Sequence, residues 1–214
     1  AVLLSYFGRA NYSYDSKYLF SATLRRDASS RFAKENRVGY FPAFSGAWNI
    51  TSEDFWKSET INFLKLRASY GELGSYPDAV YPTQGIYGNS SATSFGGGIA
   101  NGLAQTVIVD PDLVWETTKT FDIGFDAALF DNSLKITADY YSKNVEDAIV
   151  PINVPSTAGV SNQVIRNAGS LVNNGFEFDI NYSNKNSDSE LKYNVSTNFS
   201  FNLKNEAKDI PATI

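Results

Sequence analysis

Apolar and polar residues alternate along most of the chain. From Leu4 to Tyr14 every second residue is aromatic, aliphatic or Gly, and Arg9, Asn11 and Ser13 lie between them. A period of two is typical of strands that place one face against an apolar phase and the other against water. The pattern recurs near residues 18–25, 40–50, 64–70, 121–129, 134–140, 176–182 and 191–203. It predicts an all-β, antiparallel fold with eight strands of roughly nine or more residues.

The connections between these segments alternate between short and long. Short links are expected at 15–17, 131–133 and 184–189, and long loops near 27–38, 72–114 and 148–172. The link 51–60 is intermediate, and its place in the alternation assigns it to the short side. Short turns at one end and long loops at the other are typical of outer-membrane barrels, whereas a soluble sandwich has no reason to keep this order.

Mean hydropathy does not contradict a membrane location. It is −0.26, and no run of about 18 apolar residues occurs. In a transmembrane barrel every second residue faces the lumen and is polar, so the average stays low. The polar face cannot form a dry core, because each unpaired buried polar group costs about 1–3 kcal/mol. We therefore predict a transmembrane β-barrel wall, with a self-closed small barrel or a surface glycan-binding or adhesin β protein as alternatives.

Aromatic residues fall near the ends of the predicted strands. Such positions are typical of the girdles that mark membrane interfaces. On this basis we expect girdle positions at Tyr12, Tyr14, Tyr18, Trp115, Tyr140 and Tyr141.

The composition excludes several kinds of functional site and argues against one class of partner. The chain has no Cys, His or Met, so metal sites built on Cys or His, thiol nucleophiles and Ser-His-Asp triads are excluded. The net charge of −5 and the pI near 4.8 argue against nucleic acid as a partner. We expect no enzymatic activity, no metal and no cofactor.

Charged residues follow the polar face of the predicted strands. Opposed carboxylates can act as a catalytic pair only where different environments separate their pKa values, and a wet lumen provides little desolvation. We expect instead that the carboxylates neutralise Lys65, Arg67, Lys135 and Lys192 across strands, or meet a plug. The lumen-facing candidates are Lys65, Arg67, Asp122, Asp126, Asp139, Glu177 and Asp179.

Several segments, in order, resemble the SusC/RagA family of TonB-dependent outer-membrane transporters. They are Leu-Arg-Arg-Asp-Ala-Ser-Ser-Arg-Phe at 24–32, Tyr-Phe-Pro-Ala-Phe-Ser-Gly-Ala-Trp at 40–48, Leu-Lys-Leu-Arg-Ala-Ser-Tyr-Gly at 64–71, Asp-Pro-Asp-Leu-Val-Trp-Glu-Thr-Thr at 110–118, Asp-Tyr-Tyr at 139–141, Pro-Ser-Thr-Ala-Gly at 155–159, and Asn-Ala-Gly at 167–169 followed by Asn-Gly-Phe-Glu at 174–177. The match is to the carboxy-terminal part of the barrel. Two departures are Asp110, where the family often has Asn, and Arg26, where a small residue is frequent.

The resemblance implies a barrel of about 22 strands in the bacterial outer membrane, crossed many times by the chain. Residues 1–214 would supply about eight of those strands as part of the barrel domain, without the plug. The first residue is not Met and no leader precedes the first strand-like run, so the chain is read as a mature protein or a fragment. Because no plug-like segment is present, the last residue Ile214 is not the terminal aromatic common in outer-membrane barrels, and residues 208–214 resemble the start of another connection, we expect both ends to be cut.

The resemblance also implies partners and cargo. It implies import of large nutrients, oligosaccharides more than peptides, with a SusD-like surface lipoprotein, and with energy from the TonB complex acting through regions absent from this chain. Besides the outer-membrane lipid, these are the expected partners. Outer loops of the family contact substrate or lipoprotein, although their residues can instead simply pack loop against loop. The loop candidates are Tyr76, Tyr81, Tyr87, Asn89 and Phe95.

Overall fold

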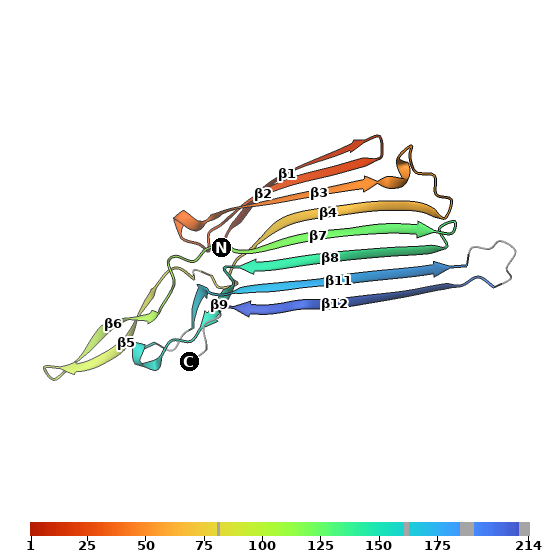
Figure 1. Ribbon diagram of the computed structural model, residues 1–214. Helices are drawn as coiled ribbons and strands as arrows, with labels where there is room; N and C mark the ends of the chain where they lie inside the picture. The colour runs from red at the N-terminus through yellow and green to blue at the C-terminus, as the bar shows by residue number, and fades with distance from the viewer. Residues whose placement is uncertain (81, 161–162, 185–190, 210–214) are drawn as a thin grey trace.

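The molecule is an extended antiparallel sheet with loops at both ends (Figure 1). The computed structural model describes residues 1–80, 82–160, 163–184 and 191–209. Eight strands form the main sheet in the order β1-β2-β3-β4-β7-β8-β11-β12, which confirms the predicted antiparallel eight-strand wall. Their bounds are β1 Leu3–Tyr14, β2 Tyr18–Ser29, β3 Val38–Asn49, β4 Ile61–Ser75, β7 Glu116–Leu129, β8 Leu134–Glu146, β11 Ser170–Ser183 and β12 Asn194–Lys208.

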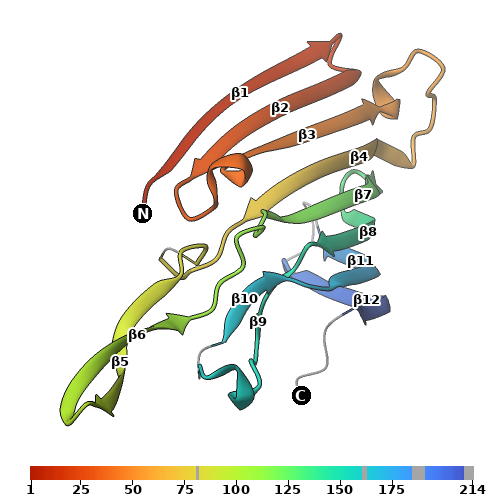
Figure 2. The same ribbon diagram turned by 90° about the vertical axis from the view of Figure 1, so that its left-hand side faces the viewer.

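The sheet curves but stays open (Figure 2). In the described part of the chain, β1 pairs only with β2 and β12 pairs only with β11. A small barrel closed by pairing β1 with β12 is therefore not what these eight strands form.

Smaller elements lie in the loops. A separate hairpin, β5 Ile86–Phe95 and β6 Gly98–Val107, extends away from the main sheet (Figures 1 and 2). The sequence predicts a loop over this stretch, because glycines and small residues interrupt its alternation. None of the helices in the described ranges is long and apolar enough to cross a membrane. The remaining elements are β9 Ile149–Ile152, β10 Val164–Asn167 and the 3₁₀ turns η1 Lys34–Asn36, η2 Ile50–Ser52 and η3 Ser156–Ala158.

The predicted order of short and long connections is confirmed in part. The links 15–17, 50–60 and 130–133 lie at one end of the sheet, and the segments 30–37, 76–115 and 147–169 lie at the other. The long loop expected near 27–38 is wrong, because β2 extends to Ser29 and leaves only residues 30–37, fewer than in the link 50–60. The short link expected at 184–189 falls almost wholly outside the described residues. We call the two ends the turn end and the loop end.

The β1–β2 turn shows why the turn end is compact. Asp15 and Ser16 both adopt positive φ, 50° and 53°, and the Lys17 amide donates to the Tyr14 carbonyl at 3.0 Å. Two left-handed residues between paired strands match the strands' own twist, so a link of three residues suffices to reverse the chain.

Strand register separates the side chains into two faces. Across β1 to β3, Tyr12 pairs with Phe20 and Ala22 pairs with Phe44 on one face, which we call the outward face. Its large apolar side chains are uncovered: Phe20 and Phe44 are each 55% exposed. The opposite, luminal face is mostly polar. Such a continuous exposed apolar face on a sheet fits contact with lipid.

The aromatic girdle is confirmed in part. Tyr14, Tyr18 and Trp48 form a series at the turn end, with ring centroids 6.4 and 6.3 Å apart. Tyr140 packs on Phe176 on the outward face at 5.1 Å.

Two of the girdle positions were wrong. Trp115 is 7% exposed, because it precedes β7 and turns into a cluster at the loop end. Tyr141 follows Tyr140 directly, so alternation places it on the luminal face, where its hydroxyl donates to Asn202 Oδ1 at 2.7 Å.

Candidate functional site

Arg67 organises the charges of the luminal face. Its Nε lies 2.9 Å from Asp126 Oδ2, and its Nη2 donates to Asp139 Oδ1 at 2.9 Å and Oδ2 at 3.1 Å. Thr137 donates its hydroxyl to Asp126 Oδ1 at 3.1 Å. The guanidinium on β4 thus bridges carboxylates on β7 and β8, as the cross-strand neutralisation hypothesis expected.

A glycine makes this bridge possible. Gly124 pairs with Arg67 on one side and Asp139 on the other. A Cβ at position 124 would lie 1.9 Å from Asp139 Oδ1 and 2.5 Å from the Ala138 carbonyl oxygen. The missing side chain therefore opens a path for Arg67 and Asp139 to meet over β7. Nothing in the alternation pattern marked Gly124 for this role.

The other luminal candidates do not join the bridge. Lys65 pairs in register with Asp126, yet Arg67 takes that carboxylate. Within the described residues, no ion pair includes Lys65, Lys135, Lys192, Asp122, Glu177 or Asp179. The expectation that Arg67 neutralises luminal carboxylates is confirmed, and the expected cross-strand ion pairs of the three lysines are wrong. Arg67 engages Asp126, the register partner of Lys65, whereas Lys135 lies opposite uncharged residues and Lys192 precedes β12.

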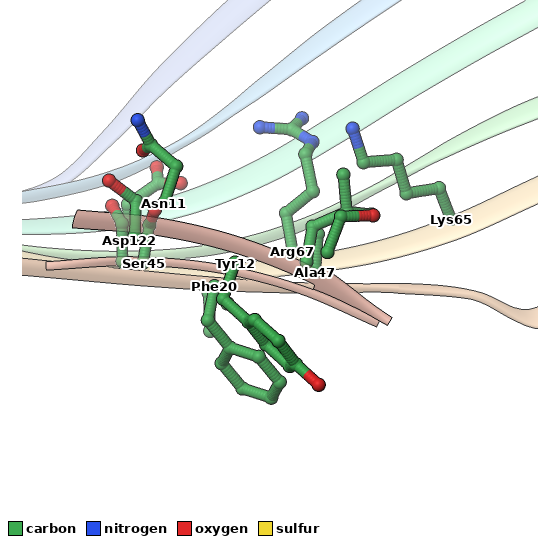
Figure 3. A pocket seen from close by; sticks show the side chains of 14 residues that line it. Asn11, Tyr12, Phe20, Ser45, Ala47, Lys65, Arg67 and Asp122 are labelled. Atoms are coloured by element: carbon green, nitrogen blue, oxygen red, sulfur yellow. The ribbon is translucent and has the colours of Figure 1, made fainter. Parts of the chain in front are cut away.

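Two shallow hollows flank Arg67 on the luminal face. The first, of about 460 Å³, has a floor of small residues that includes Ser21, Ser45 and Ser69, with Asn11, Lys65, Arg67 and Asp122 around it. Figure 3 shows Lys65, Arg67, Asn11 and Asp122 on one side of the sheet and Tyr12 and Phe20 on the other. The second hollow, also of about 460 Å³, is lined by Asp139, Glu177 and Asp179 among others.

The chemistry of this wall is that of a wet, charged surface. The side chains of Arg67 and Asp126 are each 30% exposed, so both reach solvent. In the part of the chain that the structure describes, no group of three or more Asp, Glu, His or Cys residues is arranged to hold a metal ion. The wall can hydrate, repel or bind charged and hydroxylated groups that pass along it or rest on it.

The loop candidates fall in different environments. Tyr76 packs edge-on against Trp115, with ring centroids 5.9 Å apart, and lies under the Arg31 guanidinium at 4.8 Å. Tyr87 and Phe95 are 62% and 82% exposed on the β5–β6 hairpin. Tyr81 lies outside the described residues, and the side chain of Asn89 on β5 is also outside them. Contact of any of these residues with substrate stays a prediction.

Sequence reasoning missed the cluster that holds the loop end together. Trp115 packs against Phe32 and Phe41 at 4.9 and 5.5 Å, and Leu113 is fully buried beside them. Asn167 supports it from another loop. Its Oδ1 accepts from the Val114 amide at 2.8 Å and its Nδ2 donates to the Val114 carbonyl at 2.9 Å. The only available signal was the run of loop motifs that carried the family resemblance.

A second polar cluster fastens the turn end. Glu53 accepts hydrogen bonds from the Tyr18 hydroxyl at 2.6 Å and Trp48 Nε1 at 2.9 Å, and Lys17 lies 3.3 Å away. The hydrogen bonds from Tyr18 and Trp48, with help from Lys17, lower the pKa of Glu53 below its ordinary value. The hydrogen bond to Glu53 raises the pKa of Lys17. This connects the β1–β2 turn to the β3–β4 link.

Comparison with known proteins decides the family. The model of the TonB dependent receptor-like β-barrel matches residues 3–213. The chain belongs to the TonB-dependent receptor family. Among curated relatives, it is 42% identical over 210 residues to the TonB-dependent receptor P3 of Formosa agariphila, covering 98% of this chain and 21% of that protein. It is 34% identical over 203 residues to the TonB-dependent receptor SusC of Bacteroides thetaiotaomicron, covering 92% and 20%.

A solved structure agrees with the SusC/RagA assignment. A chain of the RagAB peptide importer in the closed-closed state superposes with a TM-score of 0.83 and 27% identity, covering 97% of this chain and 22% of that one. This TonB-dependent receptor chain therefore spans about a fifth of the length of the relatives it matches. Its family consists of outer-membrane receptors and transporters rather than enzymes.

Proposed function

We propose that residues 1–214 form part of the barrel wall of an active importer of large nutrients in the bacterial outer membrane. The polypeptide crosses the membrane repeatedly as strands, and the wall performs no catalysis. Transport is driven by the TonB complex acting through parts of the protein other than this wall.

One observation supports this role above the others: a single sheet has an uncovered apolar outward face and a polar luminal face organised by Arg67. Such a sheet is stable only between lipid and water. The SusC and RagAB likenesses favour nutrient import over other uses of a barrel.

We propose oligosaccharides as the cargo class. The luminal hollow presents serine hydroxyls and the Asn11 amide, with the charged side chains of Lys65, Arg67 and Asp122 beside them. All of these groups can form hydrogen bonds with sugar hydroxyls. Peptides are the second candidate, favoured by the likeness to the RagAB peptide importer.

Uptake by cells tests the proposal. The whole protein that carries this chain is produced in a strain lacking it, and the uptake of labelled oligosaccharides and labelled peptides of equal mass is measured. Saturable uptake that stops when TonB is removed supports active import, and the preferred label identifies the cargo class. Equal uptake with and without TonB would contradict active import.

We propose that the β5–β6 hairpin is a contact for a SusD-like lipoprotein. Phe95 and Ile99 flank its tip and are 82% and 83% exposed, and Leu103 is 71% exposed. Ile99 and Leu103 lie at alternate positions of β6 and project from one face of the hairpin, while Phe95 projects from the other, because Ile99 pairs with Ser94. Exposed apolar side chains on both faces of a projecting hairpin favour a surface that another protein covers.

Substitution at the tip tests this contact. In the whole protein, the double variant Phe95→Ser with Ile99→Ser should reduce co-purification of a SusD-like lipoprotein by about tenfold. Phe55→Ser is the matched control, because Phe55 is 63% exposed but lies in the β3–β4 link at the turn end. Loss of the lipoprotein in both variants, or in neither, would contradict the proposed contact.

A further inference from the structure

Arg26 is a lone charge on the outward face of the first three strands. That face consists of alternate residues from Leu4 to Tyr14, from Tyr18 to Ala28 and from Val38 to Trp48. Arg26 is the only charged residue among them. It pairs in register with Tyr6 on β1 and Tyr40 on β3. A guanidinium therefore lies between two tyrosines on a face that is otherwise apolar.

No described residue neutralises this guanidinium. Arg26 forms no ion pair or hydrogen bond through its side chain with the residues that the structure describes. The neighbouring Asp27 points to the other face and is held by Arg25 Nε at 2.8 Å. On a later strand of the outward face, by contrast, Lys119 is paired, since its Nζ lies 2.5 Å from Glu146 Oε2. Arg26 thus differs from its counterparts on the later strands.

Its depth corresponds to the outer edge of the apolar band. Tyr18 marks the band at the turn end, and Arg26 lies about 26 Å further along β2 at about 3.3 Å per residue. With the usual tilt of barrel strands near 40°, this is about 20 Å of membrane, close to the height of about 25 Å of an outer-membrane apolar band. Arg26 is on the side of the long loops, which face out of the cell in such barrels.

The side chains at this depth favour binding of a phosphate group. Guanidinium binds phosphate oxygens through two parallel N–H donors, and tyrosine hydroxyls at a membrane interface can donate to the same group. Tyr6 and Tyr40 are 61% and 59% exposed, so both rings are uncovered beside Arg26. Charge complementarity then points to an anionic headgroup at the boundary, with its acyl chains along the apolar residues below.

We propose that Arg26, Tyr6 and Tyr40 bind a phosphate of a phosphorylated glycolipid in the outer leaflet. The occupant is a lipid, because the site opens sideways from the barrel wall onto the apolar band. This inference concerns the outward face and does not depend on which nutrient passes through the lumen.

Lipid retention by the whole protein tests the proposal. The protein is purified in mild detergent and exchanged against lipid A that carries its phosphates or has lost them, and bound lipid is counted by native mass spectrometry. The wild type should retain the phosphorylated form roughly tenfold better, and Arg26→Gln should lose that preference. Arg26→Lys should keep part of it, since an ammonium binds phosphate as a point charge.

Controls separate this site from a general charge effect. Arg9→Gln removes an arginine from the luminal face of the neighbouring strand, where Arg9 Nε donates to the Thr23 hydroxyl at 3.0 Å, and should behave as wild type. Tyr6→Phe with Tyr40→Phe keeps the fold and should weaken the preference. Equal retention by wild type and Arg26→Gln, an equal loss in Arg9→Gln, or displacement of the lipid by millimolar inorganic phosphate would overturn the proposal.

Discussion

At the scale of single residues, the luminal wall depends on a side chain that is missing. Arg67 reaches Asp139 two strands away only because position 124 between them is glycine. Most other wall residues contribute through alternation, which is easily read from sequence. The bridge instead depends on what a Cβ would meet, which no one-dimensional pattern contains.

Gly124→Ala should destabilise the barrel. The new methyl would meet both the Asp139 carboxylate and the Ala138 backbone, and overpacking of this kind costs about 1–3 kcal/mol. Unfolding of the whole protein in urea, followed by heat-modifiable migration, measures the shift. Gly8→Ala is the control, because a Cβ there has no atom within 4 Å. An equal shift in both variants would mean that strand entropy, not the bridge, sets the effect.

Arg67→Gln should lower the free energy of unfolding by about 1–2 kcal/mol. This value lies between those for exposed and buried ion pairs, because Arg67 is partly exposed. The reason is that Asp126 and Asp139 would face each other without a cation. The double variant Arg67→Gln with Asp139→Asn should recover part of the loss. Urea midpoints of the wild type, Arg67→Gln, Asp139→Asn and the double variant complete a double-mutant cycle. Additive losses would show that the two side chains do not interact.

At the scale of elements, each end of the sheet is fastened by its own cluster. Glu53 ties the β1–β2 turn to the β3–β4 link at the turn end, and Trp115 packs with residues of other segments at the loop end. Each cluster joins strand residues, such as Trp48 and Phe41 of β3, to residues of the connections. The strands determine which side chains face outward and which face the lumen, and the two clusters hold the connections at the ends of the sheet.

Acid should loosen the turn end. The pKa of Glu53 is lowered by its hydrogen bonds from Tyr18 and Trp48, so its contribution to folding is present above the ordinary value of 4.5 and is lost as pH falls through the lowered value. Trp48 fluorescence in the whole protein, followed from about pH 6 to about pH 3, should report this loss. Glu53→Gln should remove the transition, while Glu59→Gln in the same link should retain it. If the fluorescence transition is unchanged in Glu53→Gln, other carboxylates cause it.

Trp115→Ala should release the outer loops. Removing a buried tryptophan costs about 3–5 kcal/mol where the cavity stays open. Because the cluster is local, we expect faster proteolysis within 30–37 and 76–115 while the strands stay intact. Trp56→Ala, in the β3–β4 link at the turn end, is the matched control. Unchanged cleavage in Trp115→Ala would show that the loops are held by other contacts, such as the pairing of Asn167 with Val114.

The sequence alone predicted the strands of the wall, but it did not predict the clusters at the two ends of the sheet. Alternation over 121–129 places Phe121 and Asp122 on opposite faces, because a strand has only two faces. The same reasoning failed for Trp115, whose loop folds inward against Phe32 and Phe41, more than 70 residues earlier in the chain. Arg67 was expected to pair with a carboxylate. That it pairs with Asp126, the register partner of Lys65, depends on how far each side chain reaches.

At the scale of the whole molecule, the sheet is a boundary between two solvents. The exposed phenylalanines and isoleucines of the outward face and the charges of the luminal face belong to the same strands. Few residues are buried by the chain itself, so membrane lipid supplies the apolar surroundings that a core supplies elsewhere.

Cysteine labelling should reproduce this division. The chain has no Cys, so single substitutions introduce unique thiols in this region. In the whole protein in native membranes, Ile123→Cys should react only with a lipid-soluble maleimide, and Asp122→Cys also with a water-soluble one. Any other cysteines of the protein are first replaced by serine. Similar rates at both positions for both reagents would contradict the assignment of faces.

The separate pairing of β5 with β6 has a consequence for how such proteins diverge. In the part of the chain that the structure describes, this hairpin pairs with none of the eight wall strands. Lengthening it or exchanging it leaves every hydrogen bond of the wall in place, and doubling a flexible loop costs only about 0.6 kcal/mol of closure entropy. Related barrels can therefore acquire new outer surfaces when this hairpin is replaced as a unit, while the wall strands remain under the same selection.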